Sequence, residues 1–112
     1  MPVPAVLALL SDPTRRGVVD TLASGEFSAG ELAEQLEITP AALTRHLRRL
    51  RHDGVVDVSL DPDDNRRHVY RIRPAPFEEL RDWAGDIADY WGTQLSAFAT
   101  HAARTARKPR PK

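Results

Sequence analysis

Two helix-start signals lie close together in this chain, and their spacing limits the folds available to it. Ser28 and Glu31 fit a capping box, in which the serine hydroxyl and the glutamate carboxylate each accept a hydrogen bond from the other residue's backbone N–H. The helix that begins there is predicted to end near Leu36. Thr39 and Pro40 then start another helix, because threonine caps well and proline at the first helical position loses no needed hydrogen bond. The spacing predicts two helices joined by a tight turn.

The sequence pattern changes after Gly54, which can end the second of these helices. Residues 55–60 are β-branched and partly alternating, residues 61–65 are rich in turn formers, and residues 67–73 alternate again, so we expect a β-hairpin. Helices are also predicted over 4–10, from 12–13 to about 24–25, and over about 77–103. The predicted fold is mainly α with a small β-hairpin. It is a winged helix-turn-helix, whose second paired helix enters the DNA major groove and whose hairpin is the wing.

Charge is unevenly distributed in a chain whose 16 basic and 16 acidic residues cancel. Residues 39–52 contain four arginines and no acid, as do residues 66–73, whereas residues 77–90 carry five acids against one arginine. Arginines that neutralise phosphates release counterions and so favour DNA binding. A charge run on its own often only solvates a surface, but on a recognition helix and its wing we interpret it as a DNA contact.

Four motifs with their spacing also resemble a known family. Residues 11–15 (SDPTR), 30–33 (GELA), 43–51 (LTRHLRRLR) and 54–56 (GVV) resemble the ArsR family of bacterial winged-helix repressors, over roughly residues 5–73. Tyr70, with Asp82-Trp83 through Tyr90-Trp91, resembles a metal-independent subset of that family. The resemblance implies a homodimer that binds a near-palindromic operator on double-stranded DNA and represses transcription. Relatives often carry Gln and Ser where this chain has Pro40 and Ala41.

Leu43, Leu47 and Leu50 repeat at helical spacing and are expected in the core, which leaves the opposite side of their helix for DNA. The residues predicted to contact DNA are Thr39, Pro40, Ala41, Thr44, Arg45 and Arg48 in this helix, and Arg66 and Arg67 in the wing. Arg45 is the best candidate to contact a guanine through two hydrogen bonds. His46 is expected to pack at the helix edge and bond a neighbour. The aspartates of the turn are expected to cap it or to pair with Arg66 and Arg67.

The longest predicted helix carries an apolar, aromatic stripe larger than so small a domain can cover. We expect a two-fold interface with the same helix of a second chain, to which residues 3–10 also contribute. The alternative is that the helix folds back on its own domain. The residues predicted at the dimer interface are Leu7, Leu10, Leu80, Trp83, Ile87, Tyr90, Trp91, Leu95 and Phe98. Residues 1–103 are predicted to form one DNA-binding and dimerisation domain, and residues 104–112 a disordered basic tail. The tail either adds nonspecific DNA affinity or only solubilises the chain.

Other classes of function are disfavoured by what the sequence lacks. It has no Cys, which excludes disulfides and thiolate metal sites. Asp82, Asp86 and Asp89 have no histidine nearby, so neither a metal site nor a cofactor is predicted, and no catalytic constellation indicates an enzyme. No apolar run approaches a membrane span and no signal peptide is present, which predicts a cytoplasmic protein. The alternative function is a protein-interaction module whose acidic last helix docks a partner without DNA. The sequence identifies no small-molecule effector.

Overall fold

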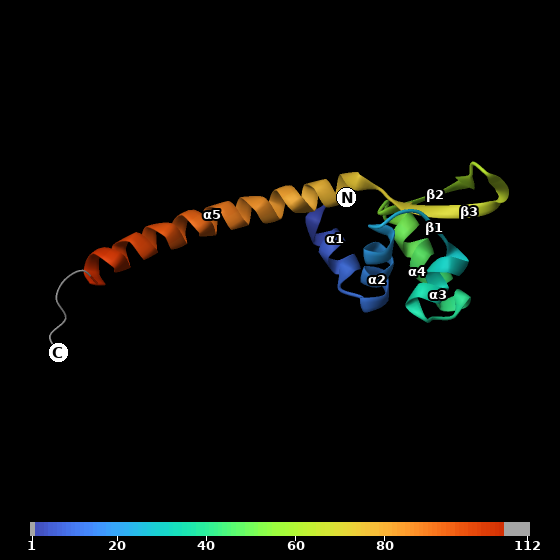
Figure 1. The fold of residues 1–112 in the computed structure, drawn as a ribbon, viewed down its shortest axis with the longest axis horizontal. Helices are drawn as coiled ribbons and strands as arrows, with labels where there is room; N and C mark the ends of the chain where they lie inside the picture. Colours follow the sequence, from blue (N-terminus) through green and yellow to red (C-terminus); the bar gives the residue numbers. More distant parts are fainter. Residues whose placement is uncertain (1, 107–112) are drawn as a thin grey trace. The chain divides into compact units, whose positions relative to one another are not determined.

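The computed structural model describes residues 2–106, with side chains to residue 104. These residues divide into a first unit that ends at Leu80 and a second that begins at Arg81. The first unit contains, in chain order, α1 (Val3–Leu10), α2 (Pro13–Leu22), β1 (Phe27–Ser28), α3 (Ala29–Leu36), α4 (Pro40–His52), β2 (Val56–Asp61) and β3 (Asp64–Ile72) (Figure 1). One helix, α5 (Pro74–Ala106), begins in the first unit and runs through the second.

The predicted helix starts are confirmed by their capping hydrogen bonds. The Asp12 carboxylate accepts from the Arg15 N–H at 2.9 Å at the start of α2. Both halves of the capping box at Ser28 and Glu31 are present, at 3.0 and 3.2 Å. The tight turn between α3 and α4 is made by Glu37, which adopts a left-handed backbone with φ 54°. The chain can therefore change direction within a few residues and begin α4.

The sheet has three strands, not the two of the predicted hairpin. Its order is β1-β3-β2, all antiparallel, and β1 joins through the pairs Phe27↔Tyr70 and Ser28↔Val69. Sequence reasoning missed β1 because a strand of two residues shows no alternation, and Ser28 had already been interpreted as a helix cap. The short strand ties the start of α3 to the wing.

Several predicted boundaries were wrong. Asp61 pairs with Asp64, so the turn is confined to Pro62 and Asp63 and β3 begins before Arg67. Helix α5 begins at Pro74 rather than at residue 77, because proline is tolerated in the first helical turn, where N–H groups have no helical partner. It continues to Ala106, past the predicted end at 103, and the rest of the predicted tail lies outside the described residues.

The core of the first unit lies where the helices meet the sheet. Leu43, Leu47 and Leu50 of α4 are buried as predicted, against other fully or nearly fully buried side chains that include Leu9, Val18, Leu22, Leu32, Val55 and Val56. Each fully buried aliphatic side chain contributes about 1.5–3 kcal/mol through the hydrophobic effect. This burial fixes the rotation of α4 about its axis and hence decides which of its residues face outward.

Candidate nucleic-acid interface

Helix α4 is held at its first turn by Thr39 and Pro40. The Thr39 hydroxyl accepts from the Ala42 N–H at 3.2 Å, and Pro40 occupies the first helical position. Both residues are exposed, as is Ala41. The beginning of the helix is thus both defined and accessible.

The side of α4 opposite its leucines is exposed. The residues predicted to contact DNA are found there and are exposed. We call them the exposed side of α4: Pro40, Ala41, Thr44, Arg45 and Arg48. The exposed Thr44 side chain donates its hydroxyl proton to the Pro40 carbonyl at 2.8 Å, and its oxygen can still accept a hydrogen bond. A helix with one buried apolar side and one exposed, hydrogen-bonding side can be placed in a DNA groove without losing its packing.

The arginines of α4 differ in whether a carboxylate neutralises them. Arg49 contacts Asp53 through Nε at 2.7 Å. Arg45 and Arg48 form no ion pair with any residue that the structure describes. The positive charge on the exposed side of α4 is therefore available to an external anion.

His46 lies at the edge of α4 and contacts a neighbour, as expected. Its Nδ1 is 3.8 Å from the Asp12 carboxylate, which also caps α2. The Arg15 N–H bond, with support from the nearby His46 and Arg15 side chains, lowers the pKa of Asp12, and partial burial opposes this shift. The contact connects the recognition helix to the first turn of α2.

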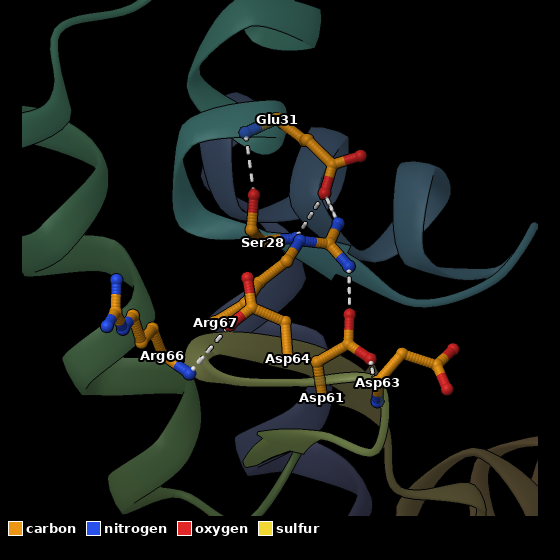
Figure 2. A network of polar contacts seen from close by, with 7 residues as sticks. All are labelled: Ser28, Glu31, Asp61, Asp63, Asp64, Arg66 and Arg67. Atoms are coloured by element: carbon orange, nitrogen blue, oxygen red, sulfur yellow. Dashed lines mark hydrogen bonds and ion pairs between the residues drawn. The ribbon is translucent and has the colours of Figure 1, made fainter.

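The wing turn is organised by its own aspartates, as predicted. Asp61 accepts from the Asp63 N–H at 2.9 Å, and Asp64 accepts from the Arg66 N–H at 3.0 Å. These bonds are drawn in Figure 2. The Arg66 side chain is exposed and makes no ion pair within the described residues. Among the described arginines of the wing, Arg66 is the one without an ion pair.

Arg67 is placed differently from Arg66, although both were predicted to contact DNA. Its guanidinium contacts the Asp61 carboxylate at 2.7 Å and also the carboxylate of Glu31 (Figure 2). Glu31 belongs to the capping box of α3, so one arginine joins the wing to the helix-turn-helix. Sequence reasoning identified Glu31 as a cap but missed this contact, because the two residues are far apart in the chain and no local pattern links them.

Helix α5 carries the predicted apolar side chains at helical spacing, and they are exposed. We call Trp83, Ile87, Tyr90, Trp91, Leu95 and Phe98 the apolar face of α5; Trp91, Leu95 and Phe98 are 57%, 62% and 70% exposed. Tyr90 and Trp91 contact each other edge to face, with ring centroids 5.7 Å apart. Leu7 of α1 is also exposed, whereas Leu10 and Leu80 are partly buried. Most of the side chains predicted at the dimer interface are therefore accessible in a single chain.

Neither a metal centre nor a membrane span is evident in the part of the chain that the structure describes. No three His, Cys, Asp or Glu side chains in residues 2–106 are grouped so that they could hold a metal ion. No described helix combines the length and apolar character needed to cross a bilayer.

Comparison with known proteins agrees with this architecture. A family model described as a helix-turn-helix domain matches residues 10–59. The HTH-type transcriptional regulator Rv2034 of Mycobacterium tuberculosis is 33% identical over 90 residues, which cover 80% of this chain and 78% of that regulator. The biofilm growth-associated repressor of Xylella fastidiosa is 44% identical over 79 residues, covering 67% of this chain and 63% of the repressor.

A solved structure gives the same result for the fold. The ArsR-like transcriptional regulator from Rhodococcus sp. RHA1 superposes with a TM-score of 0.68 at 28% identity, covering 89% of this chain and 92% of that one. The buried leucines, exposed arginines and wing, together with these relatives, define a winged helix-turn-helix protein that binds DNA and regulates transcription. The chain belongs to the ArsR family of transcriptional regulators.

Proposed function

We propose that the protein is a homodimeric repressor that binds a near-palindromic operator through the exposed side of α4. The observation that carries this proposal is the pair of unneutralised arginines, Arg45 and Arg48, opposite the buried leucines. Repression in particular is supported by relatives that are themselves named repressors, such as the Xylella fastidiosa protein.

Each exposed residue of α4 suits a different part of the duplex. Arg45, one turn from the start of the helix, is placed for two hydrogen bonds to a guanine edge, worth about 1–3 kcal/mol of discrimination. Thr44 can meet a base or a thymine methyl group, and Thr39 with the first N–H groups of α4 suits a phosphate. Arg48 suits the DNA backbone. Pro40 and Ala41 add close apolar contact but no side-chain hydrogen bond, so DNA shape contributes to specificity.

The wing arginines have separate roles in this proposal. The free side chain of Arg66 reaches the minor groove or a phosphate beside the half-site. Arg67 is a positioning residue, because its guanidinium already forms ion pairs with Asp61 and Glu31. The wing thereby keeps a fixed place relative to α4.

The dimer forms, in this proposal, through the apolar face of α5 together with α1. A symmetric operator needs two recognition helices about one DNA turn apart, and a two-fold dimer supplies them. The protein acts in the cytoplasm, where the bacterial chromosome lies, and residues 1–103 suffice for both functions.

Binding of DNA is also proposed to be independent of metal. The absence of Cys from the whole sequence removes the thiolate ligands that favour Zn²⁺ and other soft metals. Titration with Zn²⁺ is expected to show neither tight binding nor a change in DNA affinity. Stoichiometric binding with submicromolar affinity would contradict this part of the proposal.

Selection of bound sequences from random duplexes tests the main proposal. It should return two inverted half-sites whose centres are about one helical turn apart. Arg45→Ala should then lose discrimination at one base position, whereas Arg48→Ala should weaken binding to all sequences; Arg16→Ala, on the exposed surface of α2, is the control. If the Arg45 and Arg48 variants bind as the wild type does, a protein-interaction module becomes the better explanation.

A further inference from the structure

A small cavity of about 150 Å³ lies between α4 and the sheet in the first unit. Its lining comes from the start of α3, one side of α4 and the central strand β3: Ala29, Thr44, Leu47, Arg48, Arg51 and Tyr70. Pockets for drug-sized ligands are larger, at about 300–1,000 Å³. The cavity therefore suits a single compact group rather than a nucleobase or an aromatic effector.

Arg48 and Arg51 give the cavity a positive charge. Residues three apart on a helix are neighbours, and both side chains are exposed. Neither forms an ion pair with any residue in the described part of the chain, whereas Arg49 between them is neutralised by Asp53. Two guanidinium groups at one cavity favour a phosphate, whose oxygens accept several charge-assisted hydrogen bonds at once.

Tyr70 lines the cavity from a fixed position in the sheet. It pairs with Phe27 of β1 on one side and with Val58 of β2 on the other, and its partly buried side chain packs against the core. Its phenol can donate a hydrogen bond to an anion. The residues that line the cavity include no carboxylate, so an anion there meets donors without like-charge repulsion.

We infer that this cavity is a phosphodiester site, in which one DNA backbone phosphate is held by Arg48, Arg51 and Tyr70. The inference rests on the proposed function and adds Arg51 and Tyr70 to its contacts. Thr44 lines the cavity and also belongs to the exposed side of α4, so a phosphate held here fixes how α4 lies against the bases. A free phosphate ion or a phosphorylated small molecule has the same chemistry, and the experiment distinguishes these sources.

The salt dependence of binding to a random-sequence duplex tests the site without knowledge of the operator. Arg51→Ala should weaken binding and reduce the slope of log K against log salt by about 0.9 for each protomer. Tyr70→Phe removes a hydroxyl but no charge, so binding should weaken about 2- to 10-fold at an unchanged slope. Arg16→Ala removes the same charge from α2, outside the cavity, and should leave the slope as in the wild type.

The outcomes separate this inference from the proposed function. If the wild type binds the duplex and Arg51→Ala and Tyr70→Phe both behave like Arg16→Ala, the phosphate site is wrong while DNA binding stands. If the wild type binds no duplex, both the phosphate site and the proposed DNA-binding function are wrong. In the absence of DNA, inorganic phosphate should bind the wild type only weakly, because a free ion gains no further contacts from a duplex. Tight, stoichiometric binding of inorganic phosphate that Arg51→Ala abolishes would instead assign the cavity to a free phosphate.

Discussion

At the scale of single residues, the Asp12 carboxylate links two helices. It caps α2 through the Arg15 N–H and lies 3.8 Å from His46 of α4. These contacts favour the charged carboxylate, so the pKa of Asp12 is lower in the folded protein than in the unfolded chain. The charge therefore contributes stability at every pH above the ordinary Asp pKa of about 3.9, and this contribution is lost as the pH falls through the folded-state pKa.

Asp12→Asn tests the charge, because asparagine keeps a capping oxygen. Urea denaturation at about pH 7 should show the wild type to be more stable than Asp12→Asn, and the difference should shrink as the pH is lowered below the ordinary Asp pKa. Asp12→Ala loses both cap and charge and should be the least stable of the three at neutral pH. Equal stability of the wild type and Asp12→Asn at neutral pH would show that the charge contributes nothing.

Arg66 and Arg67 are adjacent in sequence but should respond differently to truncation. Arg66→Ala is expected to reduce the salt slope of DNA binding by about 0.9 for each protomer, as expected for a lost phosphate contact. Arg67→Ala removes the contacts to Glu31 and Asp61 and should lower stability by about 0.5–1 kcal/mol, at the upper end for a partly exposed ion pair. Its DNA affinity should fall at an unchanged slope, because the wing loses its position rather than a phosphate contact.

Asp61→Asn provides the matched control for Arg67. If Arg67 acts through its carboxylates, the double variant Asp61→Asn/Arg67→Ala should be scarcely weaker than Arg67→Ala alone. If the losses of DNA affinity in Asp61→Asn and Arg67→Ala are fully additive, or if Arg67→Ala lowers the salt slope, Arg67 contacts DNA directly.

Sequence reasoning at this scale succeeded where the chemistry is local. The caps at Asp12, Ser28 and Thr39 each bond to a backbone N–H three residues away, so the pattern is readable in any short window. The partners of Arg67 were only half predicted: Asp61 is nearby in the turn, but Glu31 meets the wing through the tertiary fold. Contacts of that kind depend on strand register, which no local pattern encodes.

At the scale of elements, the sequence predicted whether a segment is a helix or a strand better than it predicted where that segment begins and ends. The leucine spacing of α4 and the change of period after Gly54 were sufficient to place the recognition helix and the wing. Strand β1 was missed because its two residues are defined only by their pairing with β3. The start of α5 was placed too late because Pro74 and Pro76 look like helix breakers when their place in the first turn is unknown.

The two sides of α4 should separate stability from DNA binding. Leu50 is fully buried, and Leu50→Ala should lower the free energy of unfolding by about 2–5 kcal/mol through the cavity it leaves. Arg45 is exposed without an ion pair, so Arg45→Ala should change stability by less than about 0.5 kcal/mol. Urea denaturation at one protein concentration, with a gel shift on the selected operator, measures both effects. A large loss of stability in Arg45→Ala would mean that α4 is not oriented as described.

At the scale of the whole molecule, the proposed mode of recognition depends on two copies acting together. A single α4 offers few base contacts, and its affinity comes mainly from phosphate neutralisation, which does not depend on sequence. In the proposed dimer, two copies of α4 held by one interface would read two half-sites and combine their discrimination. The exposed apolar face of α5 is the feature that most requires a partner, because large apolar patches on a lone chain favour association.

Trp91→Glu should therefore break the proposed dimer and operator binding together. It places a charge in the middle of the apolar face of α5, where Trp91 is 57% exposed in the single chain and is expected to be buried in the dimer. Sedimentation should show a shift from dimer to monomer, and operator affinity should fall by at least about tenfold, because a monomer reads one half-site. Ser96→Glu is the control, since residue 96 lies on the opposite side of α5 by helical spacing.

A Trp91→Glu variant that remains dimeric and binds the operator normally would place the interface elsewhere. A wild-type monomer that still binds a palindrome tightly would remove the need for an interface in recognition.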